Sequence, residues 1–317
     1  MSHRRPSSFP PRLITAVFLG LVFATPAIAQ DRADDGVLQS AQVVSDAKWF
    51  VHINLVELKG SKIGEELVKH IDGNAKRKIR AFERMISFNP LEDLDAVTVS
   101  GSAAEPDKAV VVLRGAFDVP HLTDLAMAAD GYRSQEHAGQ TIHTWQDEKT
   151  PGGRLNGCII AENLMLFGPD LATLKAGIDS TLGKAAPFAA AANFPDVEGR
   201  RPPFVAAWAD LSVLDSLKIE SAFVRRVRSL HLSVGENAGQ AFARVIVDAE
   251  DGRTPKLIAQ MLAGVLALAE AAEQLPSEVA DAIDIEILGT RLVVDGAMDL
   301  DSLVEMVESL EQLKGKL

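Results

Sequence analysis

Apolar and polar residues alternate over several short runs of this chain, and such alternation predicts half-buried β-strands. The first run, WFVHINLVEL, occupies residues 49–58. Ser61 then stands as a candidate N-cap before a helical stripe of apolar residues. Asp118 and Asp170 stand in the same way where two further helices are predicted to begin. The other strands of this part are predicted as antiparallel hairpins, over residues 94–118, 132–147 and 157–168.

A similar order of elements returns in the second half of the chain. The strand FVAAWADLSVL at 204–214 resembles the strand at 50–58, and Asp299 opens a helix as Asp170 does. Between these points a hairpin, a helix begun by Pro255 and a tight hairpin follow in the same order. We therefore predict an internal duplication, with chance similarity of two α/β segments as the alternative. The expected boundaries are 47–182 for the first repeat, 183–203 for an Ala/Pro/Gly-rich connector and 204–317 for the second repeat.

Each repeat reads strand–helix–strand–strand–helix–strand–strand–helix, apart from the extra hairpin at 132–147. Because hairpins pair neighbouring strands antiparallel, this order predicts an α+β fold of two tandem βαββ(α)ββα-type repeats, with a mostly antiparallel sheet and helices on one face. The other face would then be open, and its polar positions, among them Thr98, Ser100 and His231, would meet solvent or a partner. The pattern leaves open whether the two repeats share one continuous sheet.

The first 29 residues have the pattern of a secretory signal peptide. Three arginines flank the start of an apolar run from Leu13 to Ala24, and Ala27-Ile28-Ala29 forms an A-x-A cleavage signal before Gln30. We therefore expect an exported protein, periplasmic or extracellular, that is cleaved near Ala29/Gln30 and has no membrane span after cleavage. An uncleaved N-terminal anchor is the alternative. The polar, acidic residues 30–46 are predicted to form a flexible leader.

Composition and charge narrow the classes of partner. The chain of 317 residues carries a formal net charge of −12, and cleavage would remove three arginines and leave −15. An acidic surface repels the phosphates of nucleic acid, so we expect no nucleic-acid partner. The single cysteine, Cys158, cannot form an internal disulfide and lies in the apolar run NGCIIA. We expect a buried thiol that reacts slowly with reagents.

His137 and His143 are the candidates for metal ligands, because a hairpin that turns near Gly139 could bring them together. A zinc site needs three or four converging N, S or O ligands, and two histidines supply half of such a set. His143 also shares a strand face with Thr141 and Trp145, so an exposed ladder of aromatic and histidine side chains is the simpler interpretation. We therefore predict no metal and no cofactor.

Sequence signals for catalysis are absent. Ser229 and Ser233 flank His231 at two-residue spacing, which makes them neighbours along a strand rather than an activated nucleophile and base. The sequence has no G-x-S-x-G nucleophile elbow, no Walker A motif and no G-x-G-x-x-G. No pair of carboxylates can be assigned as general acid and base from spacing alone. We lean towards a protein that is not an enzyme and predict no catalytic residues.

Two predicted helices have unusual faces. The helix at 255–274, PKLIAQMLAGVLALAEAAEQ, is apolar on most sides. A core position between the sheet and other helices is the simplest interpretation, and an amphiphile pocket or a partner groove are the alternatives. A second helix carries Lys76, Arg77, Lys78, Arg80 and Arg84, a pattern typical of a solvated helix face.

The layout, together with LDAVTVSG, GQTIHTW and NLMLFG, resembles an exported bacterial family of duplicated α+β proteins with no assigned activity. The resemblance covers most of the mature chain and rests on strands and turns, so it implies architecture and compartment but no functional residue. We expect an exported, non-catalytic protein that binds a protein or a cell-envelope component through the open sheet face. The alternatives are an amphiphile or lipid carrier that uses the helix at 255–274, and a metal-dependent enzyme around His137 and His143.

Overall fold

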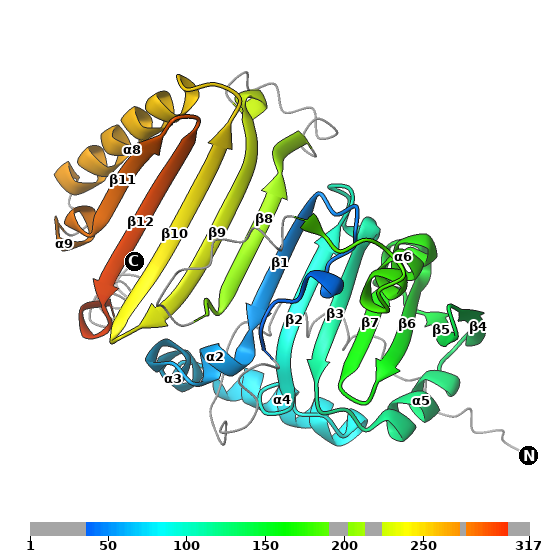
Figure 1. Cartoon of the computed structure of the whole chain (residues 1–317). Coiled ribbons are helices and arrows are strands. Elements are labelled where there is room, and N and C mark those ends of the chain that lie inside the picture. Colours follow the sequence, from blue (N-terminus) through cyan, green and yellow to red (C-terminus); the bar gives the residue numbers. More distant parts are fainter. Residues whose placement is uncertain (1–35, 190–201, 213–223, 273–276, 304–317) are drawn as a thin grey trace, which may run out of the picture.

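One continuous antiparallel sheet forms the frame of the molecule (Figure 1). The computed structural model describes residues 36–189, 202–212, 224–272 and 277–303. Within these residues, twelve strands pair in the order β11-β12-β10-β9-β8-β1-β2-β3-β7-β6-β5-β4. Every neighbouring pair is antiparallel. The α+β class and the antiparallel sheet predicted from the sequence are therefore confirmed.

The strands of the first predicted repeat are β1 to β7, and those of the second are β8 to β12. Their bounds are β1 Trp49–Asn54, β2 Leu94–Gly101, β3 Ala109–Gly115, β4 Arg133–His137, β5 Gln140–Gln146, β6 Arg154–Ala161, β7 Leu164–Gly168, β8 Val205–Asp210, β9 Val227–Asn237, β10 Gln240–Ala249, β11 Ile283–Leu288 and β12 Arg291–Asp299. The predicted strand at 49–58 ends early, because the Asn54 side chain accepts from the Glu57 N–H and caps a helix there.

The helices lie between these strands or at their ends. Their bounds are α2 Leu55–Lys59, α3 Lys62–Lys69, α4 Gly73–Ile86, α5 Val119–Met127, α6 Leu171–Thr181, α8 Thr254–Ala271 and α9 Ser277–Asp281, with short 3-10 turns η1 Ser40–Gln42, η2 Pro106–Lys108, η3 Pro151–Gly153 and η5 Val224–Arg226. No helix of the described ranges is long and apolar enough to cross a membrane.

The strand order is the same on both sides of the central pair of β1 and β8. Outward from this pair, β1-β2-β3-β7-β6 matches β8-β9-β10-β12-β11, and the hairpin of β4 and β5 extends the first side only. The sequence left open whether the halves share a sheet. They do, because Trp49–Ile53 of β1 pair with Val205–Ala209 of β8. This order agrees with the internal duplication, which stays a prediction.

Helices cover both faces of the first half of the sheet, whereas the sequence pattern predicted helices on one face. Helix α6 and the segment around η1 pack over Phe50 and Val110. Helix α4 packs through Phe82 on the opposite face, over Val97. Successive strand residues point to opposite faces, so a run such as KAVVVLRG, which is apolar at both kinds of position, has two faces to bury.

Residues 36–46 are packed against the sheet, so the predicted flexible leader is wrong for this part of the chain. Val43 and Val44 are buried, and the Val44 N–H donates to Ser100 Oγ at 3.2 Å. The Gly36 carbonyl lies 2.9 Å from His52 Nε2. Val44 is held by a residue more than fifty positions away in sequence, and a local pattern cannot reveal such a contact.

Part of the predicted connector also enters the core. Phe188 is buried and meets Phe50 and Trp208 edge-on, with ring centroids 5.8 and 5.3 Å apart. The rest of the connector from residue 190 to 201, the predicted signal peptide and the predicted helix beyond residue 303 lie outside the described residues.

Candidate functional site

The outer side of helix α8 exposes a row of large apolar side chains. Leu257, Met261, Val265 and Leu268 follow one another at spacings of four and three residues, which places them on one side of the helix. Their exposed fractions are 37%, 60%, 62% and 72%. We call this row the α8 surface.

The inner side of α8 explains why the helix lies where it does. Ile258 and Ala259 pack against Val247 and Leu292 of the sheet. The helix packs over the sheet face formed by β10, β12 and the edge strand β11 (Figure 1). Of its own residues, only Thr254 and Pro255 are buried. The simplest interpretation of the sequence, a helix wedged in the core, is therefore wrong for the outer side, because no described element covers it.

Two further apolar residues are exposed at the edge of the sheet, and of these Ile287 shares the face that α8 covers, because it pairs with Leu292. Ile287 and Leu288 at the end of β11 are 38% and 53% exposed. The turn after them lies close to the start of α8, since a Cβ on Gly252 would stand 3.4 Å from the Gly289 carbonyl oxygen. The sequence analysis missed these residues. They could have been found from the sequence as two consecutive apolar residues just before a turn. Neighbouring strand residues point to opposite faces of the sheet, so the two cannot both face the same layer.

A surface helix ordinarily carries charged and polar residues on the side that faces water. The nine residues from Met261 to Ala269 contain no polar side chain. Soluble proteins rarely leave an apolar row of this kind in contact with water unless something binds there. The α8 surface is therefore our leading candidate for a binding site.

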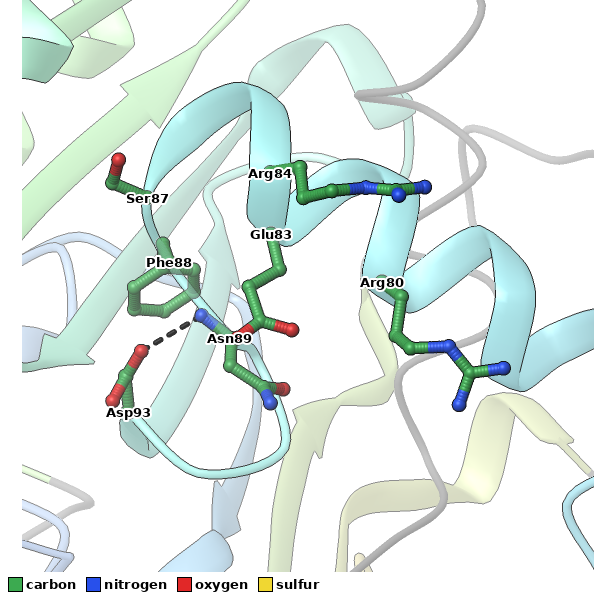
Figure 2. Close-up of a pocket in the computed structure, with 7 residues that line it drawn as sticks. All are labelled: Arg80, Glu83, Arg84, Ser87, Phe88, Asn89 and Asp93. Atoms are coloured by element: carbon green, nitrogen blue, oxygen red, sulfur yellow. Dashed lines mark hydrogen bonds between the residues drawn. The ribbon is translucent and has the colours of Figure 1, made fainter.

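A polar pocket of about 470 Å³ at the C-terminal end of α4 is a second candidate (Figure 2). Seven residues line it, namely Arg80, Glu83, Arg84, Ser87, Phe88, Asn89 and Asp93. The Asn89 N–H donates to Asp93 Oδ2 at 2.7 Å, so this carboxylate is already engaged. The sequence analysis missed the pocket, because its shape follows from Ser87, which ends α4 in the left-handed conformation at φ 52°.

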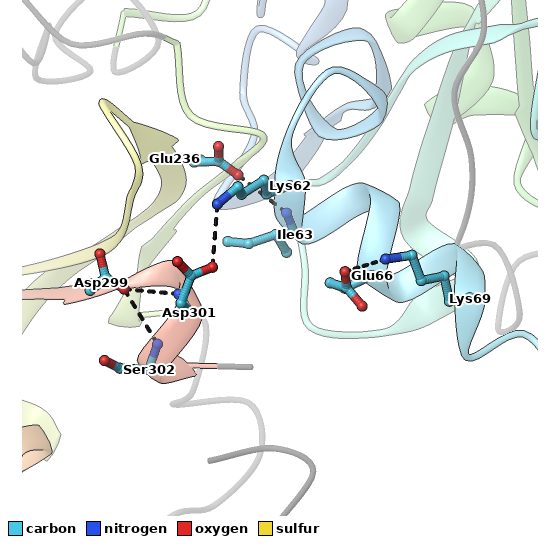
Figure 3. A network of polar contacts seen from close by, with 8 residues as sticks. All are labelled: Lys62, Ile63, Glu66, Lys69, Glu236, Asp299, Asp301 and Ser302. Atoms are coloured by element: carbon cyan, nitrogen blue, oxygen red, sulfur yellow. Dashed lines mark hydrogen bonds and ion pairs between the residues drawn. The ribbon is translucent and has the colours of Figure 1, made fainter. Parts of the chain in front are cut away.

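A polar network joins α3 to the second half of the sheet (Figure 3). Lys62 Nζ lies 3.3 Å from Asp301 Oδ1, and the Ile63 N–H donates to Glu236 Oε2 at 3.2 Å. Asp299 Oδ1 accepts from the Asp301 and Ser302 N–H groups, as predicted for a helix start at Asp299. These contacts give backbone N–H groups a hydrogen-bond acceptor and link the two halves of the sheet. We therefore assign them a structural role.

At the centre of the sheet, the polar face that was expected to be open is buried. His52, Thr98, Ser100 and Ser233 are at most 1% exposed, and His231 is 9% exposed. Thr98 Oγ1 lies 2.9 Å from His52 Nδ1, and Ser100 Oγ accepts a hydrogen bond from the Val44 N–H of the packed leader. Buried polar groups need hydrogen bonds, and here the partners come from distant segments. The part of this face around these residues is therefore not available as a binding surface, whereas Arg291 and Glu286, on the same face towards the sheet edge, remain exposed.

His137 and His143 lie on opposite faces of the β4–β5 hairpin. His137 pairs with Gln140, whereas His143 pairs with Ser134, and the two positions on β5 differ by an odd number of residues. His137 Nε2 lies 3.0 Å from Asp179 Oδ1 on α6, and His143 Nδ1 lies 3.1 Å from the Tyr132 hydroxyl. Burial lowers the pKa of His143, against a smaller opposite effect of Glu136. No group of three metal-ligating residues occurs within the described ranges.

The residues around His231 form a cross-strand ion pair rather than a catalytic triad. Arg291 Nε donates to Asp248 Oδ1 at 2.7 Å and its Nη2 donates to Oδ2 at 3.1 Å. Ser229 Oγ donates to the same carboxylate at 3.3 Å, so it is not directed at His231. Burial lowers the pKa of His231, Asp248 opposes this shift and Arg291 adds to it. A serine nucleophile needs the imidazole as its base, and the Ser229 hydroxyl is hydrogen-bonded instead to a carboxylate that already pairs with Arg291.

Cys158 is 1% exposed and packs in the same core as Phe50. Burial raises the pKa of its thiol to about 11, with a smaller contribution from Glu136. The thiolate is the reactive form, so this environment agrees with the slow labelling expected from the sequence.

These features define an α+β protein with one large antiparallel sheet and an exposed apolar helix at one end of it. No family model matches the chain, and no curated protein matches its sequence. Three crystal forms of TP0453 are among the similar solved structures. Form I has a TM-score of 0.46 and 13% identity, and covers 87% of this chain and 99% of that chain. Forms III and IV each have a TM-score of 0.44 and 12% identity, over 86% and 88% of this chain and 98% and 99% of those chains. A similarity this low says nothing about function.

Proposed function

We propose that this protein is exported and binds a lipid surface of the cell envelope through the α8 surface. The observation that carries the proposal is the exposure of Met261, Val265 and Leu268, each more than half accessible to water. Burial of a Met, Val or Leu side chain contributes roughly 1.5–3 kcal/mol. The contributions of three such side chains that enter a lipid layer together would favour binding of the protein to that layer.

The chemistry of the α8 surface favours lipid over a protein partner. Protein interfaces carry about one hydrogen bond per 100–200 Å². The stretch from Met261 to Ala269 offers no polar side chain for such bonds. A hydrocarbon layer needs none, and a helix that lies at the boundary of headgroups and acyl chains buries one apolar side there. The outer side of a helix is also convex, which suits attachment to a surface better than enclosure of a single ligand.

Vesicle co-sedimentation tests the proposal. The protein is purified in the form in which its host accumulates it, and is mixed with vesicles of phosphatidylcholine. We expect the parent protein to sediment with vesicles, and a variant with Met261→Gln, Val265→Thr and Leu268→Gln to remain in solution. These substitutions replace exposed side chains, so folding should be kept, and circular dichroism checks this.

Met127→Gln is the matched control, because Met127 on α5 is 50% exposed but does not belong to the α8 row. This variant should sediment like the parent. Equal sedimentation of the triple variant and the parent, or no sedimentation of the parent, would exclude the α8 surface as a lipid-binding site.

A further inference from the structure

We infer that the basic face of helix α4 is a second membrane contact, which selects surfaces that carry anionic phospholipids. The inference rests on the proposed lipid binding by α8, but it concerns different residues and a different force. Four basic side chains of α4 are exposed, namely Arg77, Lys78, Arg80 and Arg84, and Lys76 beside them is half-buried. We call Lys76, Arg77, Arg80 and Arg84 the α4 basic face, because they share one side of the helix, whereas Lys78 stands one turn before the inward-facing Phe82. They stand out in a chain with a net charge of −12.

Helix stability does not explain the α4 basic face. Lys76, Arg80 and Arg84 follow one another at four-residue spacing, and like charges at this spacing destabilise a helix. Lys76 lies at the end of the first turn, where the helix dipole disfavours positive charge. Of the four, only Arg84 lies in the last turn, where the dipole favours it. The packing of α4 comes instead from its inner side, through Phe82, Met85 and Ile86.

Between the described residues, no side chain of the α4 basic face forms an ion pair. The ion pairs there involve other elements. The one acidic residue of α4, Glu83, is half-buried beside the pocket. Figure 2 shows Arg80 and Arg84 extending to the same side of the helix, away from Phe88 and Asp93. Two positive charges one turn apart attract the phosphates of anionic headgroups.

The α4 basic face and the α8 surface belong to helices on the same face of the sheet. The core under α4 includes Val205 and Val234, which are paired across β8 and β9. Two residues from Val234, on the same side of β9, Leu232 pairs with Val245, which belongs to the core under α8. The positive charge therefore lies on the side of the sheet that also presents the apolar row. Charge complementarity at that side favours phospholipid headgroups with net negative charge.

Binding to two kinds of vesicle tests the inference, with phosphatidylcholine alone or with part of it replaced by phosphatidylglycerol. We expect the parent protein to bind the anionic vesicles more tightly, by roughly fivefold for each basic side chain engaged, and high salt to remove this preference. In the variant Arg80→Glu/Arg84→Glu, the ratio of the affinities for anionic and neutral vesicles should fall by at least about tenfold. The variant Arg80→Lys/Arg84→Lys should keep most of it, because a surface charge does not need the guanidinium geometry.

The matched control is Arg133→Glu/Arg154→Glu, which makes the same change in net charge at exposed positions of β4 and β6. It should bind like the parent. Equal binding to both vesicles, or an equal loss in the control, would overturn the inference. Displacement from anionic vesicles by inorganic phosphate, at constant ionic strength, would also overturn it in favour of a small-anion site.

The two proposals fail separately. Binding to phosphatidylcholine without an anionic preference leaves the α8 proposal standing and removes the α4 inference. Binding to anionic vesicles that depends on Arg80 and Arg84 but not on the α8 row supports the α4 basic face and removes the proposed function of α8.

Discussion

The ring of His52 is held between the backbone of Gly36 and the hydroxyl of Thr98, at 2.9 Å from each. A carbonyl oxygen only accepts, so Nε2 carries the proton and Nδ1 accepts from Thr98 in the neutral ring. Burial lowers the pKa of His52 from 6.5 to about 4, and the hydrogen bond to Gly36 opposes this shift only in part. The neutral ring is therefore part of the folded structure.

This depressed pKa makes stability depend on pH. Below pH 6.5 the unfolded chain binds a proton at His52 while the folded chain does not, until the pH approaches 4. We expect the free energy of unfolding to fall by about 3 kcal/mol over this window on account of His52. Urea unfolding at a series of pH values measures it. His52→Gln should flatten the dependence, and an unchanged slope in that variant would contradict the assignment.

Helix starts were the features that single residues predicted best. Ser61, Asp118 and Asp170 each accept from a backbone N–H three residues on, at 2.9, 3.0 and 2.8 Å. A cap is a local interaction, so a local pattern can find it. The burial of Thr98 and Ser100 was not predictable in this way. Their partners come from segments far away in the sequence, and an alternating strand has the same pattern whether its polar side meets water or a packed leader.

At the scale of elements, an apolar pattern predicts where a helix lies in the sequence but not whether its outer side is buried. The pattern at 255–274 predicted the helix that became α8, but it placed the outer side in the core. Burial of that side depends on whether another layer lies beyond it, and the sequence of the helix carries no information on that layer. For α4, the pattern separated an inner apolar side from an outer side with Lys76, Arg77, Arg80 and Arg84, but Lys78, which it grouped with them, stands one turn before Phe82.

The contact between α2 and α3 gives a prediction at this scale. A Cβ on Gly64 would stand 1.8 Å from the backbone oxygen of Leu58, whereas a Cβ on Gly73, at the start of α4, meets nothing within 4 Å. Gly64→Ala should therefore lower the free energy of unfolding by about 2 kcal/mol or more, because α3 has to move away from α2. Gly73→Ala should leave it unchanged or raise it slightly. Urea unfolding of both variants measures the difference, and equal stabilities would contradict this packing.

At the scale of the whole molecule, the pairing of β1 with β8 makes two predicted repeats into one sheet. The order of elements within each repeat could be predicted, because hairpins connect neighbours. The pairing between repeats could not, because β1 and β8 are separated by some 150 residues and no turn links them. The same limit applies to the candidate site, since its accessibility depends on whether another layer covers the outer side of α8.

The depth of α8 in a lipid layer is the measurement that tests the account most directly. Val265→Trp places a fluorescent side chain at the centre of the α8 surface, and vesicles of brominated phosphatidylcholine quench only a ring that enters the acyl region. We expect a blue-shifted emission and strong quenching beyond that of the parent, whose Trp49, Trp145 and Trp208 lie on the sheet. Emission of the variant that vesicles neither shift nor quench would contradict a lipid-binding role for α8.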